Sequence, residues 1–270
     1  MTSITLIGGG NMGEALVAGL IRSGHWKPSQ ITVTDVRPDV LKRLRKAYGI
    51  CICSDNRLAI HHADIVLLAV KPQQMSGVLK DLGPSIRRSQ RVLSIAAGIR
   101  TDFLERFLVP GVSAIRIMPN TPALVGAGAA AIAPGRWAKA ADLKMARAIF
   151  GTVGTVVQVK ERDMDAVTAL SGSGPAYVFF LAETLLEAGV ALGLAPSVAD
   201  ALVRQTLRGA GQLLSQSPDE PRVLRQKVTS PGGTTEAALQ VLSGKGFKKI
   251  FAQALRRAAQ RSHELSKTSD

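Results

Sequence analysis

Aromatic, cysteine and histidine residues are all scarce in this 270-residue sequence. Phe, Trp and Tyr make up 4% of the chain, which leaves few side chains for stacking on nucleic-acid bases. The two cysteines, Cys51 and Cys53, alternate along one expected strand, so they point to the same face and are not placed to form an ordinary disulfide. With four histidines and no cluster of Cys and His, we expect no metal site.

Long hydrophobic runs are missing as well. The longest strongly apolar stretches, such as IVLLAV at 65–70, have the length of a strand and not of a membrane span. A strand is expected to start at Ile4, which leaves no room for a signal peptide. We therefore expect a cytoplasmic protein with no membrane partner.

Positive charge, by contrast, is abundant: the net charge is +14, and most of the excess lies in the first 160 residues. The basic clusters KRLRK at 42–46 and RRSQR at 87–91 raise the question of nucleic-acid binding. Apolar residues interrupt both clusters at helix spacing and no aromatic residue accompanies them, which favours solvated helix faces. We expect no nucleic-acid partner.

Strands and helices alternate along the first 160 residues. This alternation predicts a doubly wound, mostly parallel sheet. The small-residue stretch GAGAAAIA at 126–133 is expected only to pack tightly against a neighbour. The expected strands lie near 4–8, 31–34, 50–53, 65–70, 91–97, 114–118 and 155–159, and the expected helices at 11–23, 38–48, 56–62, after Pro72 and at 101–107.

From Arg162 onward the periodicity is helical only. The sequence therefore predicts an α/β fold in which a Rossmann-type doubly wound sheet at 1–160 precedes an all-α C-terminal domain at 161–270. Helices are expected at 175–192, 196–215, 234–243 and 246–266.

Gly8, Gly10 and Gly13 form the pattern G-x-G-x-x-G between the first expected strand and the first expected helix. In dinucleotide-binding proteins the first glycine permits a tight turn, the second lets a pyrophosphate approach the backbone, and the third lets helix and strand pack closely. We therefore expect a dinucleotide at this loop, with Asn11 and Met12 beside it.

The choice between NADP and NAD stays open. Asp35, at the end of the second expected strand, suits the hydroxyls of the adenine ribose and repels a 2′-phosphate, whereas Arg37 could pair with that phosphate. Asn56 is either the cap of a short helix or a further contact on the adenosine side.

A second loop, VTSPGGTTEAAL at 228–239, has the features of an anion-binding loop. Its Pro-Gly-Gly segment does not easily continue a helix, Thr234 and Thr235 are good cap residues, and Glu236 opens an apolar run that can be helical. The free amides of a helix start would lie beside two hydroxyls, an arrangement that suits an anion.

Five segments occur in an order typical of one family: VKPQ at 70–73, SIAAG at 94–98, RIMPNTPALVGAG at 116–128, SGSGPAYVF at 171–179 and the loop at 228–239. They resemble the successive signature blocks of pyrroline-5-carboxylate reductase, and the resemblance extends from Ile4 to about Leu265. It implies an oxidoreductase that reduces 1-pyrroline-5-carboxylate to L-proline with NADPH or NADH, the last step of proline biosynthesis.

The resemblance also implies roles for individual residues. The loop at 228–239 would hold the substrate carboxylate, and Thr235 would donate or orient a hydrogen bond to the ring nitrogen, unless Thr235 is only a helix cap. Asn120 would face the nicotinamide, unless its turn merely ends a strand. The substrate residues are Ser230, Gly232, Gly233, Thr234 and Thr235, and the further cofactor residues are Ala69, Val70, Lys71, Pro72, Ala97 and Gly98.

Family members interleave their second-domain helices between two subunits, so we expect a homodimer at least and a larger ring of dimers. Two other functions stay open. A β-hydroxyacid dehydrogenase shares the domain arrangement but usually needs a lysine on the first helix of its second domain, and residues 174–189 contain none. A non-catalytic dinucleotide sensor would not need the intact SPGGTT at 230–235.

Overall fold

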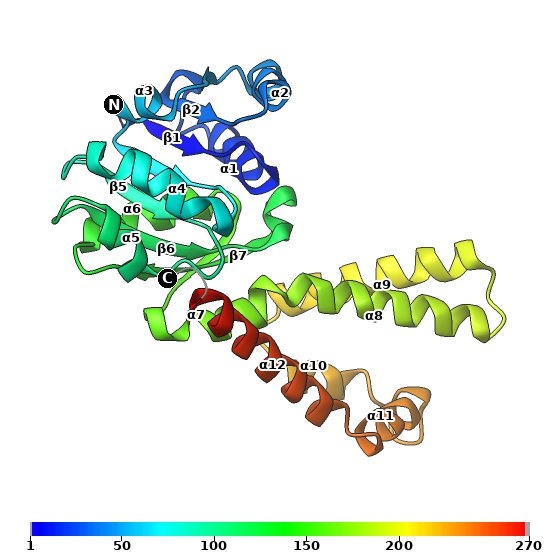
Figure 1. Ribbon diagram of the computed structural model, residues 1–270. Coiled ribbons are helices and arrows are strands. Elements are labelled where there is room, and N and C mark those ends of the chain that lie inside the picture. The colour runs from blue at the N-terminus through cyan, green and yellow to red at the C-terminus, as the bar shows by residue number, and fades with distance from the viewer. Residues whose placement is uncertain (1, 268–270) are drawn as a thin grey trace. The chain divides into compact units, whose positions relative to one another are not determined.

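The protein, described over residues 2–267 by a computed structural model, divides into two compact units. The sheet unit comprises residues 2–174 and 256–267, and the helical unit comprises residues 175–255 (Figure 1). The sequence predicts a boundary at residue 160, whereas the first segment of the sheet unit continues to Gly174. Residues 161–174 begin the helical part of the sequence, yet Met164 is buried against Ala131 and Ala133 of the sheet.

Eight strands form one sheet in the order β3-β2-β1-β4-β5-β6-β7-β8. The first six are parallel, β7 is antiparallel to β6, and β8 is parallel to β7. The order β3-β2-β1-β4-β5-β6 is that of a doubly wound dinucleotide-binding sheet, so the predicted Rossmann-type fold is confirmed. The strands are β1 (Ile4–Ile7), β2 (Ile31–Thr34), β3 (Cys51–Cys53), β4 (Ile65–Leu68), β5 (Arg91–Ser94), β6 (Ser113–Met118), β7 (Gly128–Pro134) and β8 (Gly154–Gln158).

Strand β7 was not expected. The stretch at 126–133 does pack tightly, but it does so as a strand, in register with β6 from Ile115 opposite Pro134 to Met118 opposite Ala131. Its run of alanines carries little intrinsic strand preference, so pairing with β6 decides its conformation. The helix between β7 and β8, α6 (Ala140–Gly151), was also missed.

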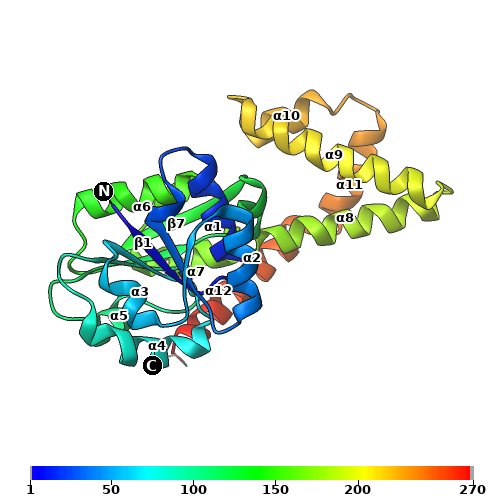
Figure 2. The ribbon, with the colours of Figure 1, turned by 90° about the horizontal axis from the view of Figure 1, so that it is seen from above.

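Helices cover both faces of the sheet (Figure 2). Both faces are therefore buried, which explains why a central strand such as β4 is apolar at every position. One face packs against α1 (Asn11–Arg22), α2 (Pro38–Tyr48) and α6, and the other against α3 (Asn56–His61), α4 (Pro72–Leu82) and α5 (Thr101–Phe107).

The predicted helices of the C-terminal part are confirmed to within one residue at each end. They are α8 (Gly174–Ala191), α9 (Pro196–Gln216), α11 (Thr234–Gly244) and α12 (Phe247–Lys267). Two short helices, α7 (Met164–Val167) and α10 (Pro221–Lys227), and a π-helical turn at Thr168–Gly172 were not predicted. Within the described residues, no helix is long and apolar enough to cross a membrane.

The helical unit has almost no interior of its own. Ala199 is the only buried residue among residues 175–255, all of which are described. On α8, Phe179 and Phe180 are 66% and 69% exposed. Burial of such side chains drives association, so these helices present an apolar surface that is open to association.

Candidate active site

The three glycines of the first loop differ in their surroundings. Gly8 has φ +111°, and a Cβ atom there would lie 2.7 Å from the carbonyl oxygen of Ala69. The backbone after β1 therefore lies close to the backbone after β4, with no room for a side chain between them. A Cβ atom on Gly13 would lie 2.5 Å from the Gly8 carbonyl oxygen, whereas one on Gly10 would meet nothing within 4 Å. The surroundings thus suit the predicted roles of turn, close packing and room for a pyrophosphate.

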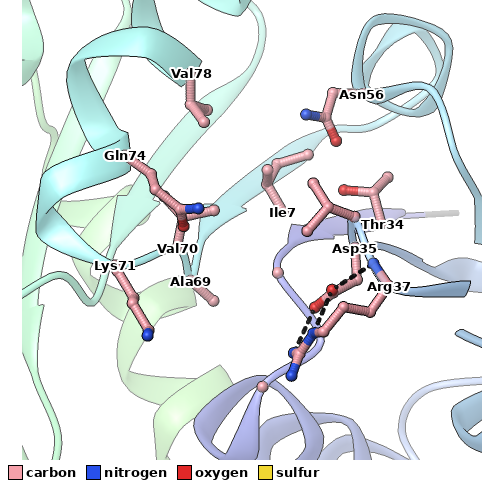
Figure 3. A pocket seen from close by; sticks show the side chains of 13 residues that line it. Ile7, Thr34, Asp35, Arg37, Asn56, Ala69, Val70, Lys71, Gln74 and Val78 are labelled. Atoms are coloured by element: carbon pink, nitrogen blue, oxygen red, sulfur yellow. Dashed lines mark hydrogen bonds and ion pairs between the residues drawn. The ribbon is translucent and has the colours of Figure 1, made fainter. Parts of the chain in front are cut away.

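A cleft of about 400 Å³ lies beside this loop, at the carboxyl ends of β1, β2 and β4 (Figure 3). This is where the strand order reverses, and open α/β sheets bind ligands at such a point. Eight of the predicted cofactor residues line the cleft: Gly8, Gly10, Asp35, Arg37, Asn56, Ala69, Val70 and Lys71.

Five lining residues were not predicted: Ile7, Thr34, Val36, Gln74 and Val78. Gln74 and Val78 lie one turn apart on α4, on the same wall as Lys71 (Figure 3). Both residues lie at i, i+4 spacing on the helix that follows β4, and this spacing is the sequence signal that could have identified them.

Seven predicted cofactor residues do not line this cleft: Asn11, Met12, Gly13, Pro72, Ala97, Gly98 and Asn120. Asn11 and Gly13 belong to the first turn of α1, and Pro72 begins α4. Met12 is partly buried against the core between the sheet and helices α1, α2 and α6. Ala97 and Gly98 follow β5, the next strand beyond β4 in the sheet. Their roles toward a dinucleotide stay predictions.

Asp35 carries the densest set of hydrogen bonds in the cleft. Its Oδ2 accepts from the Gly9 amide at 2.9 Å and from Arg37 Nη2 at 3.1 Å, and its Oδ1 accepts from the Arg37 amide and Nε, both at 3.0 Å. Burial raises the pKa of Asp35, but the hydrogen bonds from Arg37 and Gly9 outweigh burial and hold that pKa below its ordinary value. The carboxylate is therefore charged at neutral pH and holds the Arg37 guanidinium at the cleft.

Asn56 is not the cap of its helix. The cap of α3 is Asp55, whose Oδ1 accepts from the amides of Arg57 and Leu58 at 2.8 and 3.1 Å. Asn56 is the first residue of the helix, and its side chain lies at the cleft (Figure 3). The capping alternative is wrong, and a contact with the adenosine side stays a prediction.

Asn120 is held by two hydrogen bonds. Its Oδ1 accepts from the Ala129 amide at 2.8 Å, and its Nδ2 donates to the carbonyl oxygen of Ser171 at 3.0 Å. The side chain therefore joins the turn after β6 to the start of β7 and to the π-helical turn.

The loop at 230–235 belongs to the helical unit. Gly232 has φ +70°, a left-handed conformation that favours glycine. Gly233 occupies the N-cap position and α11 begins at Thr234, so the expectation that the two threonines cap the helix is wrong. Thr234 and Thr235 are its first two residues, and the amides of a first turn lack partners within the helix.

The same loop already binds a carboxylate. The Gly232 amide donates to Oε2 of Glu236 at 2.7 Å, and the Gly233 amide donates to the Ser230 carbonyl oxygen at 3.0 Å. One backbone amide, that of Gly232 just before the N-cap, thus binds a negative charge without a cationic side chain. No group of three or more His, Cys, Asp or Glu residues within 2–267 is arranged to hold a metal ion.

The doubly wound sheet and its glycine-lined cleft define an NAD(P)-dependent oxidoreductase, and residues 3–98 match the family model described as NADP oxidoreductase, coenzyme F420-dependent. Residues 161–265 match the model described as pyrroline-5-carboxylate reductase dimerisation. Over 99% of its length the chain is 42% identical to the whole of a pyrroline-5-carboxylate reductase from Corynebacterium melassecola. The chain belongs to the pyrroline-5-carboxylate reductase family.

Solved structures agree with this assignment. A pyrroline-5-carboxylate reductase from Coxiella burnetii is 39% identical, with a TM-score of 0.93 and 98% of each chain covered. A pyrroline carboxylate reductase from Plasmodium falciparum, solved with NADP bound, is 30% identical, with a TM-score of 0.86 and 98% of each chain covered. The resemblance drawn from the five sequence segments is confirmed.

Proposed function

We propose that the protein reduces 1-pyrroline-5-carboxylate to L-proline with hydride from NADPH or NADH, as the last step of proline biosynthesis. The observation that carries this proposal is the loop at 230–236, where the Gly232 amide beside a helix start already binds the carboxylate of Glu236. The chain also contains a cleft that fits a dinucleotide, because Gly10 leaves open space beside the loop and Arg37 carries an exposed cation.

The reaction asks the protein mainly to align two ligands and to exclude water. The bound nicotinamide supplies a hydride to the carbon of the C=N bond, and the ring nitrogen gains a proton. In the proposal, the amides of Thr234 and Thr235 and the Ser230 hydroxyl hold the substrate carboxylate. Left-handed Gly232 and the N-cap residue Gly233, whose amide donates to the Ser230 carbonyl oxygen, shape the loop. The Thr235 hydroxyl donates or orients the hydrogen bond to the ring nitrogen.

On the cofactor side, the loop from Gly8 to Gly13, with Asn11 and Met12, receives the pyrophosphate. Asp35, Arg37 and Asn56 contact the adenosine half, with Asp35 favouring a free ribose and Arg37 favouring a 2′-phosphate. In the proposal, the segments Ala69–Pro72 and Ala97–Gly98 line the ribose and nicotinamide halves.

The working form is a homodimer at least, and we propose a larger ring of dimers. The exposed phenylalanines of α8 support association, and the loop at 230–235 would serve a site completed by a second copy. Nucleic acid is not a partner in this proposal, since Leu41 and Leu44 of α2 are buried and Arg43 pairs with Glu14 at 2.6 Å, as on an ordinary helix face. We place the enzyme in the cytoplasm.

Purified protein mixed with NADPH or NADH and 1-pyrroline-5-carboxylate should oxidise the cofactor and form proline. Oxidation of a hydroxy acid in place of reduction of the imine would favour a β-hydroxyacid dehydrogenase, although α8 has no lysine. A sensor would give no turnover, and its binding to labelled DNA at physiological salt would separate that function from an inactive preparation.

A further inference from the structure

The π-helical turn at Thr168–Gly172 is followed, three residues after its end, by Pro175. In an α-helix the carbonyl oxygen of Ser171 would accept a hydrogen bond from the amide four residues on, but that residue is Pro175, which has no N–H. The chain widens here instead, and the Ser173 amide donates to the Thr168 carbonyl oxygen at 2.8 Å. The helix therefore cannot supply the usual donor to Ser171.

Asn120 supplies a donor to that carbonyl oxygen. Its Nδ2 lies 3.0 Å from the Ser171 oxygen, although the two residues are 51 positions apart in the sequence. Its Oδ1 is engaged at the same time by the Ala129 amide at 2.8 Å. The position therefore uses a donor and an acceptor on two separate atoms of one short side chain, which Asn provides and an ionised Asp, or Ala, does not.

The π-helical turn also packs on the end of β6. A Cβ atom on Gly172 would lie 2.5 Å from Cε of Met118, the last residue of that strand. Carboxyl ends of parallel strands are where doubly wound sheets bind ligands, and π-helical turns are frequent at functional sites. A small shift of Ser171 would therefore move the backbone beside this edge.

We propose that Asn120 is a positioning residue that replaces the hydrogen-bond donor Pro175 lacks, and that it serves the reaction through Ser171 and not by contacting the dinucleotide. This assignment rests on the proposed function. It differs from the role expected from the sequence, in which Asn120 faces the nicotinamide.

A double-substitution cycle tests the proposal. Asn120→Ala should lower kcat/KM by about tenfold, mainly through kcat with the KM for the cofactor little changed. It should also lower Tm by about 4–8 °C, as expected for two lost hydrogen bonds in a chain of this size. Adding Pro175→Ala restores an N–H that can donate to Ser171, so the double variant should recover to within about threefold of wild type. The Ala129 amide stays unpaired, which is why recovery is partial.

Pro196→Ala is the matched control. Extended backbone at Ala195 precedes Pro196 at the start of α9, whereas helical backbone at Ser173 precedes α8, so a restored amide at position 196 has no preceding helical carbonyl to reach and this change should recover nothing. If Asn120→Ala fails to fold, Asn120→Asp takes its place in the cycle, since Asp keeps the acceptor for Ala129, loses the donor and adds a negative charge that should enlarge the loss.

The opposite result is a double variant as slow as Asn120→Ala, with a raised KM for the cofactor and additive losses in Tm. That result would assign Asn120 to the dinucleotide and overturn the proposal. The Tm cycle needs no substrate, so a wild type that makes no proline would refute the proposed function while the cycle still decides whether Asn120 acts through Ser171.

Discussion

Asp35 and Arg37 should set the choice between NADPH and NADH. The Asp35 side chain is only 7% exposed and accepts four hydrogen bonds, three of them from Arg37, whose side chain is 56% exposed. Arg37 is therefore presented at the cleft but is partly occupied by its own carboxylate. Asp35→Ser removes a charge that repels a 2′-phosphate and frees the guanidinium to bind that phosphate.

The expected shift follows from the contacts exchanged. A charge-assisted hydrogen bond gained or unblocked contributes about 1–3 kcal/mol, which corresponds to a factor of roughly 5–150 in preference. Asp35→Ser also removes the acceptor of the Gly9 amide, so it should weaken the binding of both cofactors. The quantity to measure is therefore the ratio of kcat/KM for NADPH to kcat/KM for NADH, from which the shared loss cancels.

Two further variants sharpen the assay. Asp39→Ser removes a nearby exposed carboxylate that makes no hydrogen bond to Arg37, and it should leave the ratio within about twofold because the two groups interact through solvent. Arg37→Gln should lower the ratio and should abolish the gain when combined with Asp35→Ser. A ratio that Asp35→Ser leaves unchanged would refute the reasoning and show that Asp35 only shapes the glycine loop.

Three other changes have defined outcomes. Thr235→Ala should lower the rate of imine reduction by about 10²-fold, while the cofactor affinity measured by fluorescence titration stays unchanged. Thr235→Ser should retain much more activity than Thr235→Ala. Equal turnover in the wild type and both variants would show that this hydroxyl takes no part in the chemistry. Glu161→Gln should cost about 3–5 kcal/mol in urea unfolding, because the carboxylate pairs at 2.6 Å with Arg116, which is 2% exposed, and a loss below about 1 kcal/mol would show that the pair contributes little. Asp142 is buried, which raises its pKa, but hydrogen bonds from the Lys139 amide and Arg91 hold that pKa below the ordinary 3.8. Its stabilisation is therefore present above that pH and lost as pH falls through the lower folded-state value, so Asp142→Asn should flatten the acid limb of stability against pH, and an unchanged limb would contradict this.

Much of the fold could be predicted because its signals are local. Helix α2 begins and ends where the sequence analysis placed it, since Pro38 and Gly49 mark its ends and buried Leu41 and Leu44 mark its inner face. Strand β7 could not be predicted, because its alanines become a strand only through pairing with β6. Helix α10 was missed because its seven residues carry too few apolar positions to define a period.

The same difference between local signals and contacts of distant segments applies to the cleft. Residues at strand ends were found from the glycine pattern and the strand spacing, whereas Gln74 and Val78 depend on the direction in which α4 leaves the sheet. The hydrogen bond from Asn120 to Ser171 joins residues 51 positions apart, so no local pattern contains it. The N-cap at Gly233 was missed because two threonines follow it and are the more usual capping residues.

Because the helical unit has almost no buried core, we expect its folding to depend on protein concentration. With Ala199 as its only buried residue, the segment 175–255 buries little apolar surface by itself, so we expect its stability to depend on association through the region that matches the dimerisation model. Its melting temperature should then rise with total protein, and its refolding should slow on dilution as encounters between chains become limiting. Activity measured at very low enzyme concentration would accordingly report the mass action of assembly together with the chemistry.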